Sequence, residues 1–302
     1  MRVIITGGTG LIGRALAANL VADGHEAVVL SRNPRQVTGL PAGVRVEGWD
    51  TQTPAGWGAL VDGAEAVVNL AGENLSAWLW TDAQKERIRA SRLNAGRAVV
   101  QAIEAAAHKP RVVVQASGVG YYGSHGDEEL TEDDEPGQGF LPELAVEWEN
   151  VTLPVEELGV RRVIVRSGGV LSGDGGLLPK ALIPFRLFAG GPVGSGKQWV
   201  PWIHIADEVR AIRFLLEREE ARGPFNLVSP LPVTNADFGK ALARAVGRPF
   251  LMPAPAFAVR AALGELSSVI LEGQRALPKR LSELGFTFQF ESINSSLQDL
   301  LG

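Results

Sequence analysis

The stretch VIITGGTGLIG, residues 3–13, decides the fold of this 302-residue chain. Its apolar start predicts a short buried strand, and apolar residues at helical spacing follow from Leu11 to Asp23. Glycines at positions 7, 10 and 13 lie between the two, where they allow a tight turn and close backbone approach. Unpaired N–H groups at the start of such a helix favour a pyrophosphate. The stretch therefore predicts a dinucleotide-binding strand, turn and helix.

Further apolar runs continue this alternation of strands and helices. Strands are predicted at residues 27–30, 44–46, 66–70, 112–114, 162–166 and 225–228. Helices are predicted at residues 81–107, 140–158 and 205–219. Thr81 or Asp82 is the expected cap of the first of these helices, and Pro154 should distort the end of the second. Because continuous apolar strands alternate with helices, we expect an α/β protein with a Rossmann-type, doubly wound parallel sheet.

The amino-acid composition changes after the strand at 162–166. Residues 168–196 are rich in glycine and proline, which favours loops and short elements. We therefore expect residues 1–170 with 205–230 to form the Rossmann domain. Residues 171–204 with 231–302 are expected to form a smaller substrate and C-terminal lobe.

Composition excludes several classes of function. The net charge of -5 argues against nucleic-acid binding, and the absence of cysteine excludes disulfides, thiolate nucleophiles and cysteine-ligated metals. The N-terminus runs straight into the glycine turn, and no apolar run reaches the roughly 20 residues that span a bilayer. We expect a cytoplasmic protein without a membrane partner. The acidic runs at 127–129 and 132–135 lack the spacing of a calcium loop and are expected to be solvated, so no metal site is predicted.

The end of the second strand indicates which dinucleotide is bound. NAD-binding versions usually carry an acidic residue there, which accepts hydrogen bonds from the ribose 2′-hydroxyl. This chain has Ser31 and Arg32, with Arg35 close behind, so we predict NADP(H), whose 2′-phosphate a guanidinium can pair with. Ordinary solvated loop arginines are the alternative. Asp50 follows the third strand, where it could bond the adenine edge or close a turn.

These motifs resemble those of the extended short-chain dehydrogenase/reductase superfamily. TGGTGLIG (6–13) resembles its opening motif, NLAG (69–72) its fourth-strand motif and WIHIAD (202–207) the stretch before its late helix. The stretches GEN (72–74), SR (91–92), GVGYY (118–122) and GGPVGSG (190–196) resemble one branch, the epimerase-family proteins labelled nucleoside-diphosphate-sugar epimerase or cell-division inhibitor. LEGQRALP (271–278) resembles the small uncharacterised domain that closes these proteins.

The resemblance covers essentially the whole chain and implies a Rossmann domain with NADP(H), and a homodimer is expected by the same analogy. It does not supply a substrate. Motifs and resemblance together predict cofactor contacts at Gly7, Thr9, Gly10, Leu11, Ile12, Ser31, Arg32, Arg35, Asp50, Asn69, Leu70, Ala71, Gly72, Ser91, Arg92, Ser167 and Gly168.

The resemblance also implies a catalytic tyrosine, whose pKa is lowered by a lysine four residues later. The chain has only Tyr121 and Tyr122, and neither is followed by a lysine at that spacing. By their distance from Trp148 and Glu149, the usual tyrosine and lysine positions fall near Leu141 and Ala145, which cannot transfer a proton.

Ser117, at the end of the fifth strand, matches the serine that bonds the substrate carbonyl or hydroxyl in this superfamily. We predict Ser117, Tyr121 and Tyr122 as the catalytic candidates, with Arg92 as an assisting cation. The alternative is that both tyrosines wall the cofactor site and Ser117 merely ends a strand.

Other polar and aromatic residues are weaker candidates for a functional role. His204 and Asp207 precede or begin a helix and are expected to cap it. Trp199, Trp202 and Phe185 could line a substrate cleft, although large aromatics are more often core. Cations that could recognise an anionic substrate such as a nucleotide sugar are Arg166, Arg186, Lys197 and Arg275.

Three functions follow from these observations. The first is an NADP(H)-dependent oxidoreductase or epimerase acting on a small polar substrate between the two lobes. The second is an NADP(H)-responsive binding or regulatory protein that has lost catalysis, suggested by Leu141 and Ala145. The third is a relic Rossmann fold without cofactor affinity.

Overall fold

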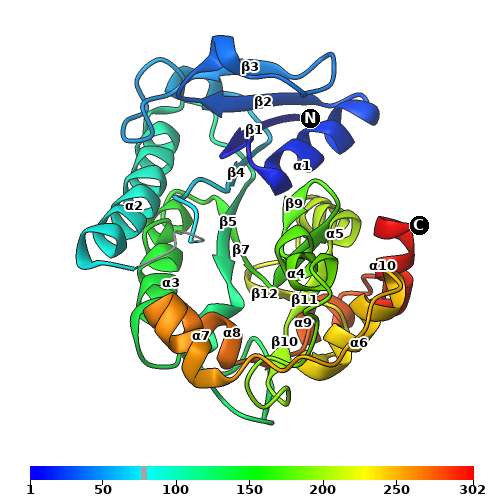
Figure 1. Cartoon of the computed structure of the whole chain (residues 1–302). Coiled ribbons are helices and arrows are strands. Elements are labelled where there is room, and N and C mark those ends of the chain that lie inside the picture. Colours follow the sequence, from blue (N-terminus) through cyan, green and yellow to red (C-terminus); the bar gives the residue numbers. More distant parts are fainter. Residues whose placement is uncertain (76–79) are drawn as a thin grey trace.

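The computed structural model describes residues 1–75 and 80–302, and its centre is a seven-stranded sheet in the order β12-β7-β5-β4-β1-β2-β3 (Figure 1). All neighbouring strands in this sheet are parallel. Its strands are β1 (Arg2–Thr6), β2 (Glu26–Ser31), β3 (Arg45–Gly48), β4 (Ala66–Asn69), β5 (Val112–Gly118), β7 (Arg161–Ser167) and β12 (Gly223–Leu227). Strand order reverses at β1, so the predicted Rossmann-type sheet is confirmed.

Two layers of helices cover this sheet, as Figure 1 shows. On one face lie α1 (Leu11–Ala22) and α5 (Ile205–Glu217), and on the other lie α2 (Asp82–Ala105) and α3 (Phe140–Asn150). Leu16 of α1 and Ile212 of α5 share one apolar core with the sheet, whereas Val99 and Ile103 of α2 fill a second core on the opposite face. Alternate residues of β1, β2, β4 and β5 therefore enter different cores, which explains why these inner strands are largely apolar.

Local sequence signals set the helix ends. The Thr81 side chain accepts a hydrogen bond from the Gln84 amide, so the predicted cap of α2 is present. The predicted helix 140–158 is too long, because α3 ends at Asn150 and a separate 3₁₀ helix covers Leu153–Glu156. Pro154 lies in the first turn of that 3₁₀ helix, where its missing N–H does no harm.

The remaining elements form a smaller lobe beside the carboxyl ends of the strands. They are β6 (Glu129–Leu130), β8 (Gly169–Ser172), β9 (Gly175–Gly176), α4 (Leu178–Arg186), β10 (Trp199–Val200), β11 (Trp202–His204), β13 (Val233–Thr234), α6 (Asn235–Ala245), α7 (Ala256–Leu263), α8 (Ser268–Leu271), β14 (Arg275–Ala276) and α10 (Ile293–Leu301), whereas α9 (Lys279–Glu283) packs against the main core. A third apolar core, with Leu182, Trp202, Leu242 and Leu297 among its members, joins α4, β11, α6 and α10.

One part of the C-terminal region packs differently from the predicted lobe. Leu281, Phe286 and Phe288 enter the main core beside α5, where Phe286 meets Phe214 edge to face. Residues 281–288 therefore belong with the Rossmann core, because their aromatic side chains fill the outer edge of its helix layer. In the described part of the chain, no helix is both long enough and apolar enough to cross a membrane.

Close packing of α2 against the end of α3 depends on Gly96. A Cβ atom at this position would lie 2.2 Å from Cγ1 of Val151, far inside van der Waals contact. We expect Gly96→Leu to lower the free energy of unfolding by about 1–3 kcal/mol, because overpacking forces side chains and backbone apart. Urea denaturation measures this change. Arg97→Leu, at the neighbouring exposed position, is the control and should change stability little.

Candidate cofactor and catalytic site

The glycine turn after β1 is built for a ligand rather than for a side chain. Gly7 has a φ of 64°, and a Cβ there would lie 2.7 Å from the Leu70 carbonyl group, so only glycine fits. Gly10 caps α1 without a side-chain hydrogen bond. The first amides of α1, at Leu11 and Ile12, therefore keep unpaired N–H groups at the positive end of the helix.

The end of β2 offers a free cation. Arg32 and Arg35 are exposed, and neither has a partner in the part of the chain that the structure describes. The Ser31 hydroxyl accepts a hydrogen bond from the Asn33 amide and so fixes the turn. The carboxylate of Asp50 accepts bonds from the backbone and side chain of Thr53, and these bonds hold its pKa below the ordinary value. Asp50 thus closes a turn, and its contact with adenine stays a prediction.

The end of β4 is held by a buried chain of hydrogen bonds. Thr6 Oγ1 donates to Asn69 Oδ1 at 2.6 Å, and Asn69 Nδ2 donates to Gln115 Oε1 at 2.8 Å. The Ala71 amide donates back to Thr6 Oγ1. The Asn69 side chain is fully buried and aligns β1, β4 and β5, and its contact with the cofactor stays a prediction.

Ser91 and Arg92 of α2 hold the loop that follows β4. The Glu73 amide donates to Ser91 Oγ at 2.9 Å, and Arg92 Nη1 donates to the Glu73 carbonyl at 3.1 Å. Arg92 lies over the ring of Trp148, and burial lowers its pKa to about 10. The Arg92 guanidinium thus contacts the Glu73 loop and the Trp148 ring, and its role as an assisting cation stays a prediction.

Ser167, at the end of β7, is paired with an acid that the sequence did not single out. Its hydroxyl donates to Glu208 Oε1 at 2.6 Å. Glu208 is fully buried in the first turn of α5, and its Oε2 has no partner among the described residues. Burial raises the pKa of Glu208 to about 8, so the carboxyl is protonated at neutral pH.

Ser117 lies in a buried polar network at the ends of β5 and β7. Its hydroxyl donates to Glu149 Oε1 at 2.7 Å. Arg166, paired with Ser117 in the register of β5 and β7, donates to both oxygens of Glu149 at 2.8 and 2.9 Å. Burial alone would lower the pKa of Arg166, but the hydrogen bonds to Glu149 raise it above its usual value. Arg166 therefore keeps its positive charge in this buried setting.

The two tyrosines occupy different environments. Tyr122 is fully buried, and its hydroxyl donates to Asn226 Oδ1 at 2.7 Å and accepts from Arg166 at 3.1 Å. Burial raises the pKa of Tyr122 to about 12. The structure thus gives Tyr122 a structural position, in contrast to its predicted catalytic one. Tyr121 is half-buried, with the Arg166 guanidinium 3.4 Å from its ring centroid, and burial raises its pKa as well.

Helix α3 carries the positions where a tyrosine and a lysine were expected. Leu141 and Ala145 lie in its first two turns, and Glu149 follows Ala145 by one further turn. Glu149 therefore reaches Ser117 and Arg166 from that helix. Sequence reasoning missed Glu149, although its spacing of four residues from Ala145 was the available signal.

Several weaker candidates are structural. His204 caps α5 by accepting a bond from the Ala206 amide, and buried Asp207 accepts bonds from the amides of Gln289 and Phe290. Trp202 and Phe185 lie in the third apolar core, and Trp199 bonds Asp127. Two of the cations proposed for an anionic substrate are already paired, Arg166 with Glu149 and Arg275 with Glu129.

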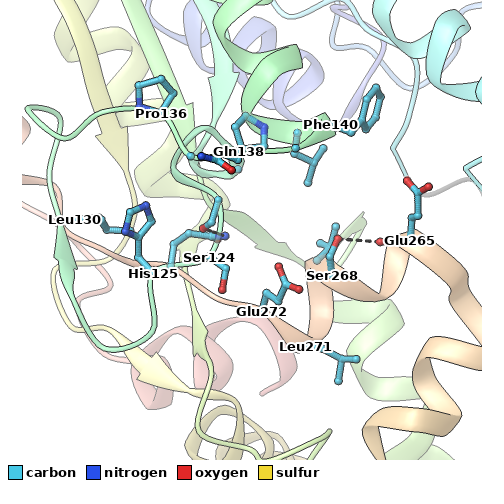
Figure 2. A pocket seen from close by; sticks show the side chains of 18 of the residues that line it. Ser124, His125, Leu130, Pro136, Gln138, Phe140, Glu265, Ser268, Leu271 and Glu272 are labelled. Atoms are coloured by element: carbon cyan, nitrogen blue, oxygen red, sulfur yellow. Dashed lines mark hydrogen bonds between the residues drawn. The ribbon is translucent and has the colours of Figure 1, made fainter.

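The acidic segment after Tyr122 is not simply solvated. Glu132 is buried, and its carboxylate accepts hydrogen bonds from the amides of Asn226 and Arg280, in contrast to the predicted solvated loop. Glu128, Glu129, Asp134 and Glu135 border an open cavity of about 1150 Å³, which also reaches Gly120 and Leu141. Figure 2 shows part of its lining. No cluster of His, Asp or Glu suited to a metal ion occurs among residues 1–75 and 80–302.

Comparisons with known proteins cover the whole chain. The model of the NAD dependent epimerase/dehydratase family matches residues 3–227, and that of a domain of unknown function (DUF1731) matches residues 254–300. Epimerase family protein YfhF of Bacillus subtilis is 37% identical over 302 residues, with 100% of this chain and 98% of that protein covered. Epimerase family protein SDR39U1 of Mus musculus is 37% identical over 306 residues, with both chains covered completely. The predicted resemblance is confirmed.

Solved structures agree with these matches. The crystal structure of human epimerase family protein SDR39U1 (isoform 2) with NADPH has a TM-score of 0.90 and 36% identity, covering 100% of this chain and 99% of that one. A nucleoside-diphosphate sugar epimerase from Corynebacterium glutamicum has a TM-score of 0.80 and 36% identity, covering 100% of this chain and 58% of that one. MoeE5, in complex with UDP-glucose and NAD, shares the fold at 21% identity and a TM-score of 0.75.

The raised pKa of Glu208 predicts how stability depends on pH. The native protein keeps a proton that the unfolded chain releases near its ordinary pKa of 4.5, so the free energy of unfolding should fall as pH rises from about 4.5 to about 8. Glu208→Gln still accepts the Ser167 hydrogen bond but cannot titrate. We expect it to remove a fall on the order of a few kcal/mol. Urea denaturation across this pH range tests the difference, and parallel curves for the two proteins would contradict it.

Proposed function

Because the chain belongs to the NAD dependent epimerase/dehydratase family, we propose that it is an NADP(H)-dependent oxidoreductase or epimerase acting on a small polar substrate. One arrangement carries the proposal. No side chain caps the N-terminus of α1, and Arg32, at the end of β2, is exposed and has no partner among the described residues. Similarity to a protein crystallised with NADPH supports the choice of cofactor.

The residues present fit this cofactor. The amides of Leu11 and Ile12 would hold the pyrophosphate, and the positive φ of Gly7 shapes the tight turn that leads to them. Arg32 would pair with the 2′-phosphate, where a carboxylate would repel it. When bound, the nicotinamide supplies or accepts a hydride at its C4 atom.

Ser117 and Tyr121 are the groups proposed to act on the substrate. Ser117 gives its only proton to Glu149, so its remaining lone pairs can accept a hydrogen bond from a substrate hydroxyl. The Tyr121 hydroxyl can donate a proton to a carbonyl oxygen; burial raises its pKa and so weakens it as an acid, and the charge of the adjacent Arg166 opposes that rise. In the reducing direction the carbonyl carbon gains the hydride and its oxygen gains the Tyr121 proton, which gives an alcohol and the oxidised cofactor.

Cofactor choice can be tested at the end of β2. Arg32→Asp should weaken NADPH binding about tenfold to a hundredfold and leave NADH binding nearly unchanged, because only NADPH carries the 2′-phosphate. Fluorescence titration of both cofactors measures this difference. Arg186→Asp makes the same change of charge at an exposed site on α4 and is the control. An equal loss for both cofactors would count against the assignment.

The two tyrosines provide a matched pair of variants. Once a substrate is turned over, Tyr121→Phe should lower kcat about 10²- to 10⁴-fold with the fold intact, because the proton donor is lost. Tyr122→Phe should instead lower the free energy of unfolding by about 1–3 kcal/mol, because Arg166 and Asn226 lose a buried partner. Steady-state kinetics and urea denaturation separate the two effects, and the reverse pattern would refute the assignment.

A second candidate function rests on Leu141 and Ala145, which stand on α3 where a proton-transferring pair is expected. In this alternative, NADP(H) is a ligand that shifts a conformational equilibrium between the lobes. Hydrogen exchange measured with and without NADPH tests it, since identical protection in both samples would exclude the regulatory role.

A further inference from the structure

An open cavity of about 1150 Å³ lies between the loop 123–142 and the segment 260–274 of the C-terminal region. It reaches Gly120, the residue before Tyr121, and Leu141 in the first turn of α3. Its volume slightly exceeds the range of about 300–1,000 Å³ that is typical of sites for small molecules. The cavity is therefore placed and sized to receive the substrate of the activity proposed above.

The walls of this cavity carry mostly negative charge. Its carboxylates are Glu128, Glu129, Asp134, Glu135, Glu265 and Glu272. Arg260 is the one permanently charged cation among the lining residues that the structure describes, and His125 is the one histidine. A ligand in this cavity consequently meets a negative potential, which attracts cations and repels phosphates.

Ion pairs neutralise only part of this charge. Lys85 pairs with Glu265, Arg275 pairs with Glu129, and His125 lies 3.3 Å from Glu128. Glu135 and Glu272 have no partner in the described part of the chain. Figure 2 shows the Glu272 side chain projecting into the cavity between Ser124 and Ser268. At least one unpaired carboxylate thus faces the space that a ligand would fill.

An aromatic wall adds to this preference. Trp80 and Phe140 pack edge to face at 5.4 Å, and both line the cavity. The Lys85 ammonium already lies 5.4 Å from the Phe140 ring centroid, so this wall tolerates a positive charge beside it.

The N-terminus of α3 is the main feature that would favour an anion. Phe140 and Leu141 offer its first amides, whereas Pro142 has no N–H to give. Glu143 lies in the same turn and offsets the positive end of the helix. The helix end can therefore hold a neutral oxygen, such as a carbonyl, but it does not outweigh the surrounding carboxylates.

We propose that this cavity is the substrate site and that it selects a small molecule bearing an ammonium or other cationic group, not a nucleoside diphosphate. The inference rests on the proposed function, since it assigns the substrate class of the same site. Glu272 holds the cationic group, and the reacting carbon lies toward Gly120 and Tyr121. A diphosphate would bring two or more negative charges against these carboxylates, with Arg260 as the one permanently charged lining cation among the described residues to offset them.

Three alcohols of equal chain length test the selection by charge. They are 4-amino-1-butanol, 1-pentanol and 5-hydroxypentanoate, which are cationic, neutral and anionic. Binding to the NADPH-saturated full chain is measured by saturation-transfer NMR at low ionic strength. We expect 4-amino-1-butanol to bind at least tenfold more tightly than 1-pentanol, and 5-hydroxypentanoate not to bind. Failure of the ammonium compound to bind, or tighter binding of the anion, overturns the proposal.

Matched variants locate the effect. Glu272→Gln should weaken binding of 4-amino-1-butanol about threefold to tenfold and leave 1-pentanol unchanged. Glu104→Gln is the control. It removes the same charge at an exposed position in the last turn of α2, far along the chain from the cavity residues, and should leave binding of both alcohols unchanged. Equal effects of the two variants would show that the attraction is diffuse and would refute the site.

Titration of NADPH on the same samples separates this inference from the proposed function. Tight NADPH binding without selection among the alcohols refutes the cationic site and leaves the cofactor assignment standing. Absence of NADPH binding refutes the proposed function itself.

Discussion

A guanidinium and a carboxylate, both nearly excluded from water, hold the functional end of this molecule together. Arg166 of β7 and Glu149 of α3 pair through two hydrogen bonds, and each also fixes a neighbour, Tyr122 or Ser117. Removal of two charges from water costs several kcal/mol for each ion, and only complete hydrogen bonding offsets such a cost. The arrangement around Arg166 and Glu149 therefore needs both residues, because loss of either partner leaves the charge of the other buried and uncompensated.

This pairing also explains what the site can do without the expected tyrosine and lysine on α3. The helix still points one polar side chain at the substrate end of β5, but that side chain is Glu149, an acceptor, in place of a proton donor. Proton donation consequently falls to Tyr121, which comes from the loop after β5 and is stacked on Arg166. Tyr121 therefore still has a cation beside it. That cation is the Arg166 guanidinium, which lies over the face of the ring, in place of the ammonium of a lysine on the same helix.

The sequence predicts the sheet, the glycine turn and the cap of α2, because each depends on residues that are close together in the chain. It does not predict the pairing of Arg166 with Glu149 or the burial of Glu132, since a charged residue at a strand or helix position carries no sign of its distant partner. The sequence predicts a helix that continues to residue 158, but α3 ends at Asn150, because Pro154 lies in a separate 3₁₀ turn and does not distort a continuing helix. The fold was thus predictable, whereas the arrangement of the polar site required long-range contacts.

The short parallel pairing of β6 with β14 binds the C-terminal region to the loop that follows Tyr122. Through the same junction, Asn226 donates to the Leu277 carbonyl, and Glu132 accepts from the Arg280 amide. The last fifty residues consequently supply hydrogen-bond partners for the buried polar groups of the first domain and form part of its packed structure. A chain cut before residue 254 would lose the partners of Asn226 and Glu132, so the two segments have to be engineered as one unit.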